Sequence, residues 1–155
     1  MRNQGFSIIE LVFVIVIIGV VVMIGAPRLK DSIEKQNRRS MRAALVTYVA
    51  VARNTAVARG CRSSVHFVSG GNSRVWVTAC SVKQGAALTA RDTVVGPEWT
   101  EAQWNHRFVA GRDSINFDSR GLRQNLVRTK ITIRNKQDQD RDSVVVNEVG
   151  KVTYP

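Results

Sequence analysis

The sequence predicts an α+β fold, in which one long N-terminal helix packs on a C-terminal domain made of an antiparallel β-sheet. Three patterns support this prediction. Residues 6–26 are almost entirely apolar with one charged exception, residues 29–56 repeat apolar side chains at helical spacing, and from Ser63 the apolar period changes to two. The 155 residues provide enough chain for one small domain in addition to the helix.

The first predicted element is a membrane-spanning helix over residues 6–26. About 21 residues at about 1.5 Å of rise each cover about 30 Å, the thickness of the hydrocarbon core of a bilayer. Only Met1–Gly5 precede this run, with one positive charge at Arg2, and no small-residue cleavage site follows it. An ordinary secretory signal peptide therefore fits poorly, and we expect a cut before the apolar run.

Glu10 is the charged exception in the apolar run. A carboxylate at membrane depth costs about 3 kcal/mol on insertion scales, so Glu10 needs a partner or a function. Residues 11–14, the next helical turn, contain no basic side chain. The nearest candidate charge is the amino terminus that cleavage after Gly5 would create, either on this chain or on a neighbour packed beside it.

The segment Gly5-Phe6-Ser7-Ile8-Ile9-Glu10 resembles the processing site of class III signal peptides, which type IV pilins and type II secretion pseudopilins carry. The resemblance implies that a prepilin peptidase removes residues 1–5 and methylates Phe6, and that Glu10 pairs with the terminal amine of an adjacent subunit. It also implies a single-pass protein of the bacterial inner membrane with a periplasmic domain. An assembly platform in that membrane would then build it, with other pilins or pseudopilins, into a helical pilus or pseudopilus filament.

Pro27 interrupts the helical pattern, because its nitrogen cannot donate a hydrogen bond to the Met23 carbonyl. In the pilin family a Gly and a Pro, here Gly19 and Pro27, flank a segment that melts when subunits enter a filament. The alternative is a simple kink that steers the domain away from the membrane. Apolar spacing predicts that the helix continues to about Ala58. The expected organisation is a leader, a membrane-spanning half-helix and a globular domain with the rest of the helix: 1–5, 6–27 and 28–155.

Alternating stretches at residues 64–68 and 74–78 flank a Gly-rich turn and predict a β-hairpin. Residues 81–105 are poorly patterned; we expect a turn at Gly96-Pro97, with Trp99 and Trp104 covering the core. Further strands are predicted at 114–117, 127–134, 143–147 and 149–154. This order resembles the GspH/FimT group of minor pilins and pseudopilins. The Ala/Arg-rich helix end at 50–60 and the segment Phe117-Asp118-Ser119-Arg120-Gly121 carry the resemblance.

Cys61 and Cys80 both follow the membrane segment. In an oxidising periplasm they can form one disulfide that closes a loop of about 20 residues, worth about 3 kcal/mol in the chain-entropy model. The alternative is a pair of buried free thiols. Metal binding by the pair is not expected, because His66 and His106 are too scattered for a zinc spacing.

The formal net charge of +11 favours anionic partners: nucleic acid, lipid headgroups or acidic faces of sister subunits. The candidate DNA-binding residues are Arg120, Arg123, Arg128, Lys130, Arg134 and Lys151. Arg128, Lys130 and Arg134 share one face if their strand is regular. A DNA-binding face, a surface for acidic sister subunits and a merely solvated face all remain open. Some DNA-uptake members of the group carry a Gly-Arg-x-Arg turn, and here Gly150-Lys151-Val152-Thr153 keeps one basic residue.

An enzyme is not expected, because no nucleophile elbow, Walker loop or His-rich metal site is present in the sequence. No cofactor is expected either, and His66 and His106 are expected to be structural. Asp138, Asp140 and Asp142 alternate like the start of a calcium loop, but Arg141 interrupts them and a solvated turn is the preferred interpretation. The resemblance implies a minor type IV pilin that acts in assembly, initiation or at the tip. A type II secretion pseudopilin and a DNA receptor for natural transformation are the alternatives.

Overall fold

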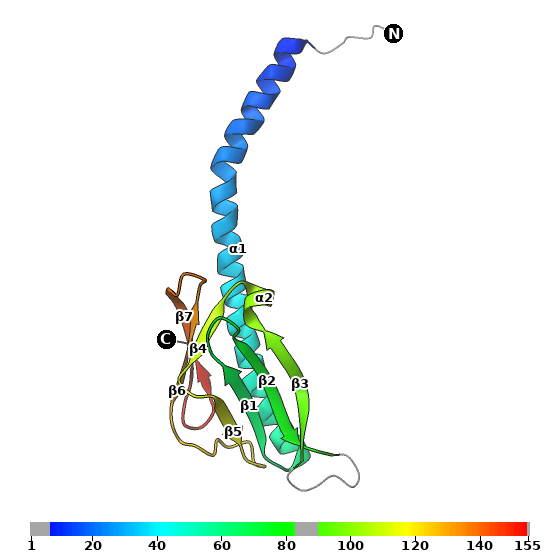
Figure 1. Ribbon diagram of the computed structural model, residues 1–155, viewed down its shortest axis with the longest axis vertical. Coiled ribbons are helices and arrows are strands. Elements are labelled where there is room, and N and C mark those ends of the chain that lie inside the picture. The colour runs from blue at the N-terminus through cyan, green and yellow to red at the C-terminus, as the bar shows by residue number, and fades with distance from the viewer. Residues whose placement is uncertain (1–6, 83–89, 155) are drawn as a thin grey trace. The chain divides into compact units, whose positions relative to one another are not determined.

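The computed structural model of the chain describes residues 7–82 and 90–154. It separates into two compact units, with the boundary between Gln36 and Asn37. Helix α1 (Ile8–Arg59) is one unbroken helix and contributes residues to both units. The strands and the short second helix all belong to the second unit, as Figure 1 shows.

Helix α1 is 52 residues long, and its two ends follow from local chemistry. The first turn is closed by the Glu10 and Leu11 N–H groups, which donate to the Ser7 carbonyl at 3.0 and 3.2 Å. At the other end Gly60 takes a φ of +62°, a conformation that suits a residue without Cβ, and the Cys61 N–H donates back to the Ala56 carbonyl at 3.1 Å. The predicted end near Ala58 is therefore correct to within one residue.

The second unit contains two four-stranded antiparallel sheets, ordered β3-β2-β1-β5 and β4-β6-β7-β8 (Figure 1). The elements are β1 (Ser63–Val68), β2 (Arg74–Cys80), β3 (Arg91–Trp99), α2 (Thr100–Trp104), β4 (Arg107–Ala110), β5 (Ser114–Phe117), β6 (Thr129–Arg134), β7 (Asp140–Val146) and β8 (Val152–Thr153). The predicted α+β class is confirmed, with the strands divided between two sheets where one was expected.

The core of this unit forms where one stripe of α1 meets the inner faces of the sheets. The buried helix residues recur three or four positions apart, so they share one face: Met41, Leu45, Val49, Ala52 and Ala56. Phe67 and Phe108, from different sheets, meet edge to face with ring centroids 5.9 Å apart. The buried stripe therefore lies in the later half of the helix.

Gly96 and Pro97 lie inside strand β3, so the predicted turn at this dipeptide is wrong. Val77 pairs with Val95 and Val75 pairs with Glu98, which leaves one extra residue on β3 and forms a β-bulge. Because β3 is an edge strand, a proline without an N–H is tolerated there. Trp99 was also expected to cover the core, but its side chain is 48% exposed.

Several strand boundaries differ from the predicted ones. Strand β6 begins at Thr129 and leaves Arg128 outside it, while β7 begins at Asp140, earlier than expected. Strand β4 and helix α2 were not predicted, because each is too short to establish a period. The early start of β7 places Asp140 and Asp142 in the sheet, whereas Asp138 lies in the exposed stretch before β7, where a solvated turn was expected.

Candidate functional site

The first part of α1 exposes a continuous apolar surface. Its most apolar 18-residue window has a mean hydropathy of 3.1, and none of it is buried within the described chain. Ile8 is 84% exposed and Met23 is 82% exposed. Among the described residues, α1 is the one helix long and apolar enough to cross a membrane. A surface of this kind needs lipid or another protein to cover it.

Glu10 lies in the first turn of α1, exposed on this apolar segment. It is the only charged residue between positions 7 and 27. The predicted processing residues Gly5 and Phe6 fall outside the described part of the chain. The role of Glu10 therefore stays a prediction, resting on a carboxylate surrounded by apolar side chains.

The predicted melting segment between Gly19 and Pro27 is helical throughout. A Cβ added at Gly19 would meet nothing within 4 Å, so no contact inside the described chain requires a glycine there. What glycine does at this position is weaken the helix, by about 1 kcal/mol relative to alanine. This lower helix stability is compatible with the predicted melting of the segment, which stays a prediction.

Cys61 and Cys80 form a disulfide, with Cα atoms 6.2 Å apart, and this prediction is confirmed. The bridge joins Cys61, two residues after the end of α1, to the last residue of β2. Arg59 adds a hydrogen bond from Nη1 to the Cys80 carbonyl at 2.8 Å. The end of α1 is thus fixed to the first sheet by one covalent bond and one hydrogen bond.

Arg123, one of the predicted DNA-binding residues, is buried and bonded to its own chain. Its Nη1 donates to the Val146 and Asn147 carbonyls at 3.1 and 3.0 Å, and its Nη2 donates to the Thr129 hydroxyl. Burial lowers the pKa of the guanidinium, and Arg112 nearby contributes in the same direction. Arg123 therefore holds the β6 and β7 region together, and its guanidinium is not available to a phosphate.

Two other predicted DNA-binding residues are already paired with carboxylates. Arg120 bonds Asp118 at 3.2 Å, and Arg134 bonds Asp140 at 2.7 Å. Hydrogen bonds from the Leu122 and Arg120 N–H groups lower the pKa of Asp118 and keep it ionised. Arg128, Lys130 and Lys151 are exposed. Lys130 shares a shallow cleft with Asp140 and Asp142, so the outer face of β6 carries charges of both signs.

The three aspartates of the calcium-like segment point to three different arginines. Asp138 lies 3.5 Å from Arg107, Asp140 lies 2.7 Å from Arg134, and Asp142 lies 3.2 Å from Arg42. In the described part of the chain, no three His, Cys, Asp or Glu side chains gather as a possible metal site. Asp140 and Asp142 instead connect β7 to β6 and α1, and Asp138, just before β7, is paired with β4.

The outer face of the first sheet carries a stack of aromatic and cationic side chains that sequence reasoning missed. His66 and Trp76 are cross-strand neighbours, with ring centroids 5.0 Å apart and planes 15° from parallel. The Arg74 guanidinium carbon lies 5.4 Å from the Trp76 centroid and 5.3 Å from the Trp99 centroid. Burial and the charge of Arg91 lower the pKa of His66, so it is neutral at pH 7.

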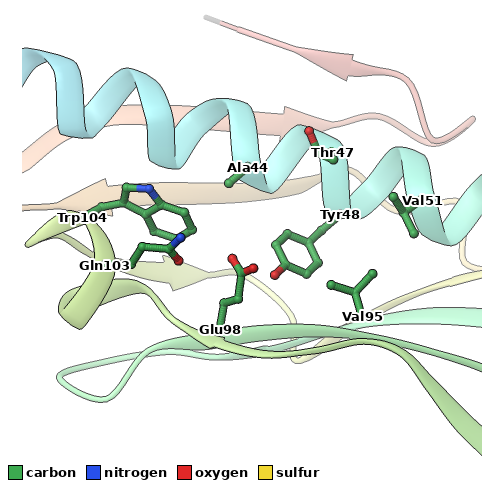
Figure 2. A pocket seen from close by; sticks show the side chains of 8 residues that line it. All are labelled: Ala44, Thr47, Tyr48, Val51, Val95, Glu98, Gln103 and Trp104. Atoms are coloured by element: carbon green, nitrogen blue, oxygen red, sulfur yellow. The ribbon is translucent and has the colours of Figure 1, made fainter.

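A cleft opens on the opposite side of β3, between α1, β3 and α2. It has a volume of about 300 Å³ and is lined by Ala44, Thr47, Tyr48, Val51, Val95, Glu98, Gln103 and Trp104. In Figure 2 the Tyr48 hydroxyl, which comes from α1, points at the Glu98 carboxylate from β3. Sequence reasoning missed this site because Tyr48 reads as an ordinary core residue and Glu98 lies in the unpatterned stretch.

Comparison with known proteins identifies sequence families and structures of the same fold. The sequence matches the family of type II transport protein GspH over residues 43–150 and the prokaryotic N-terminal methylation motif over residues 1–26. The structure is similar to the type IV minor pilin FimU of Pseudomonas aeruginosa, with 13% identity and a TM-score of 0.56, covering 79% of this chain and 90% of that one. It is also similar to the minor pseudopilin EpsH from the type 2 secretion system of Vibrio cholerae, with 10% identity and a TM-score of 0.55, covering 76% of this chain and 94% of that one. No curated protein sequence matches the chain.

Proposed function

The chain belongs to the type II transport protein GspH family, and from this premise we propose that it is a minor type IV pilin. Members of this pilin and pseudopilin class assemble with other pilins into a filament. In this proposal α1 first anchors the subunit in the bacterial inner membrane with the β-domain in the periplasm. The subunit then leaves the membrane and enters the filament, where it helps to initiate assembly or occupies the tip.

Glu10 is the observation that carries this proposal. Its carboxylate lies in the first turn of an exposed apolar helix, within the N-terminal methylation motif. A lone carboxylate in such a helix is costly in lipid, but it gains a partner if the amine of an adjacent subunit approaches it. In the proposed assembly, a prepilin peptidase removes residues 1–5 and methylates Phe6, and Glu10 then pairs with the amine of a neighbour.

The membrane-spanning half, residues 6–27, is proposed to change conformation during this transfer. Gly19 lowers helix stability without serving any contact of the described chain, and Pro27 lacks the N–H that would close a helical hydrogen bond. The segment between them is the one that we expect to extend. The remaining residues, 28–155, form the rest of the helix and the globular domain.

The proposal is tested by recovering the protein from its host, from both membranes and sheared filaments. Mass spectrometry should find a mature chain that begins at a methylated Phe6. Glu10→Ala should remain in the membrane at normal level and be depleted from filaments. Glu34→Ala, which removes a carboxylate outside the apolar run of the same helix, is the matched control and should enter filaments normally. Filaments that contain chains beginning at Met1, or equal incorporation of both variants, would contradict the proposal.

A type II secretion pseudopilin is the alternative, favoured by the GspH family match and by the likeness to EpsH. The likeness to FimU and EpsH does not decide between a pilus and a secretion system, because the two TM-scores are nearly equal. At such low sequence identities, the likeness supports only a shared fold. Deleting the gene separates the alternatives. Loss of surface filaments with intact protein secretion supports the pilin, whereas the reverse supports the pseudopilin.

DNA binding is a second candidate activity, favoured by the stack of Arg74 between Trp76 and Trp99 on a chain of net charge +11. Aromatic rings beside a cation are the usual contacts for single-stranded DNA. Binding should then weaken with salt, at a slope of about −0.7 per phosphate contact on single strands or about −0.9 on duplex. Arg74→Ala and Arg128→Ala should each flatten that slope by about one unit. No binding at low salt would remove this candidate.

A further inference from the structure

The cleft between α1, β3 and α2 contains a buried hydroxyl that points at a carboxylate (Figure 2). Tyr48 is 5% exposed, and its hydroxyl has no hydrogen-bond partner within residues 7–82 and 90–154. Leaving a buried hydroxyl unsatisfied costs about 1–3 kcal/mol, and the Glu98 carboxylate is the acceptor toward which this hydroxyl points. The hydroxyl oxygen can still accept a hydrogen bond from a donor outside the chain. Burial and the nearby Glu98 carboxylate raise the pKa of Tyr48, which keeps the phenol protonated at physiological pH.

Glu98 reaches this cleft because of the β-bulge at Gly96-Pro97. Val95 and Glu98 are three residues apart, so in a regular strand they would point to opposite faces of the sheet. The extra residue on β3 puts both on the inner side, paired with the buried residues Val77 and Val75. Bulges commonly redirect a side chain in this way next to functional sites. The β-bulge, where the sequence predicted a turn, is therefore what directs the Glu98 carboxylate toward Tyr48.

The Glu98 carboxylate has no ion-pair partner in the described chain, although basic residues outnumber acidic ones 23 to 12. The four ion pairs among the described residues use other acids: Asp118, Asp138, Asp140 and Asp142. Glu98 is half-buried, so its charge is only partly screened by water. A cation supplied from outside the chain would find an available acceptor here.

The walls of the cleft suit a cation on a flexible apolar stem. The aromatic side chains of Tyr48 and Trp104 lie on either side of Glu98 in Figure 2, where they can face a positively charged group. Ala44, Val51 and Val95 supply apolar surface for methylene groups. A volume of about 300 Å³ is enough for the end of one long side chain.

We propose that the cleft receives an arginine or lysine side chain of a neighbouring filament subunit, whose cationic head pairs with Glu98. The Tyr48 hydroxyl accepts a hydrogen bond from the incoming N–H group and donates a hydrogen bond to the Glu98 carboxylate. This arrangement satisfies the hydroxyl and the carboxylate together. Opposite charge selects the occupant, because Glu98 is a half-buried acid without an ion-pair partner among the described residues. The inference rests on the proposed function for the source of the side chain.

The test uses the full chain in detergent micelles and a capped peptide, acetyl-Gly-Arg-Gly-amide, as the probe. The neutral control is the same peptide with citrulline, which has nearly the shape of arginine without its charge. Binding is followed by the shift of the Trp104 indole N–H resonance at constant ionic strength. The arginine peptide should shift this resonance in a saturable manner. The affinity of the citrulline peptide should be lower by about tenfold or more, because it loses a charge-assisted hydrogen bond.

Variants assign the effect to the cleft. Glu98→Gln should weaken the arginine peptide about tenfold, and Tyr48→Phe should weaken it severalfold, whereas Glu101→Gln is the matched control because Glu101 lies on α2 but does not line the cleft. The amide proton spectrum of each variant shows whether it is folded. Equal binding of the two peptides, or unchanged affinity in Glu98→Gln, would overturn the inference.

A filament experiment supplies the second arm. Glu98→Arg should enter filaments less well than Glu101→Arg, because it places a positive charge where the neighbour brings its own. Equal incorporation of these two variants would overturn the neighbour as the source of the side chain. Peptide binding is measured without filaments, so the outcomes separate. A chain that enters filaments but does not bind the arginine peptide refutes the cleft alone, and a chain that binds the peptide but never enters filaments refutes the proposed function.

Discussion

Replacing Arg123 with alanine should destabilise the globular unit by about 3 kcal/mol. The guanidinium donates to two main-chain carbonyls, Val146 and Asn147, and to the Thr129 hydroxyl. Each buried acceptor left without a donor costs about 1–3 kcal/mol, and water entering the vacated space recovers part of that cost. Removal of Nε, which is buried without an acceptor among the described residues, offsets another part. After both offsets, the net loss of unfolding free energy should equal the cost of one unsatisfied acceptor at the upper end of that range, about 3 kcal/mol.

The assay is urea unfolding of the full chain in detergent, followed by tryptophan fluorescence, because Trp76, Trp99 and Trp104 all lie in the globular unit. Arg123→Lys keeps the charge, but a single ammonium group cannot reproduce the fork of the guanidinium and should lose most of the same stability. Arg128→Ala is the matched control. Its side chain is exposed, so its unfolding free energy should change by less than about 0.5 kcal/mol.

The structure and the earlier DNA-binding expectation give opposite results for this residue. If Arg123→Ala unfolds at the same urea midpoint as the unchanged protein and instead weakens DNA binding, the guanidinium faces solvent and the structural reasoning is wrong. If stability falls while the salt dependence of any DNA binding keeps its slope, Arg123 is a structural residue.

Three further predictions concern the same unit. Reducing the Cys61–Cys80 disulfide and alkylating the thiols, or replacing both cysteines with serine, should lower the unfolding free energy by about 3 kcal/mol relative to the disulfide-bonded protein. Gly150→Ala should lower the melting temperature, because φ is +83° there and a Cβ would lie 2.8 Å from the Phe117 ring. Folding lowers the pKa of His66 below 6.5, so the unfolded state binds the proton more tightly. The unfolding free energy should therefore be highest above pH 6.5 and decline as the pH falls below it. His66→Gln should remove that decline.

The sequence predicted best where a pattern is long and repeated. The apolar run containing Glu10 and the three-to-four spacing beyond Pro27 predicted α1 to within one residue at its C-terminal end. The β1–β2 hairpin followed from strict alternation around Gly70 and Gly71, and β5 was predicted with its observed bounds. These elements are set by local preference and by one buried face, both of which are visible in the chain itself.

The sequence failed where pairing between distant segments decides the structure. Gly96-Pro97 is typical of a turn, but pairing with β2 draws it into an edge strand as a bulge. Arg123 is indistinguishable in sequence from its exposed basic neighbours, and only the approach of Val146 and Asn147 identifies it as a buried donor. The Tyr48–Glu98 cleft depends on that same bulge, so it could not have been predicted without the pairing of β3 with β2.

The disulfide gives the subunit a defined path for mechanical load. A pull on the N-terminal end of α1 passes along the helix to Cys61, just before the chain enters β1. Because Cys61 is bonded to Cys80, the tension is delivered to the start of β1 and the end of β2 together. These two positions are next to each other in the antiparallel pair, since Ser63 lies opposite Ala79. The hairpin is therefore pulled as one cross-linked piece, and traction on the helix cannot peel β1 away from β2.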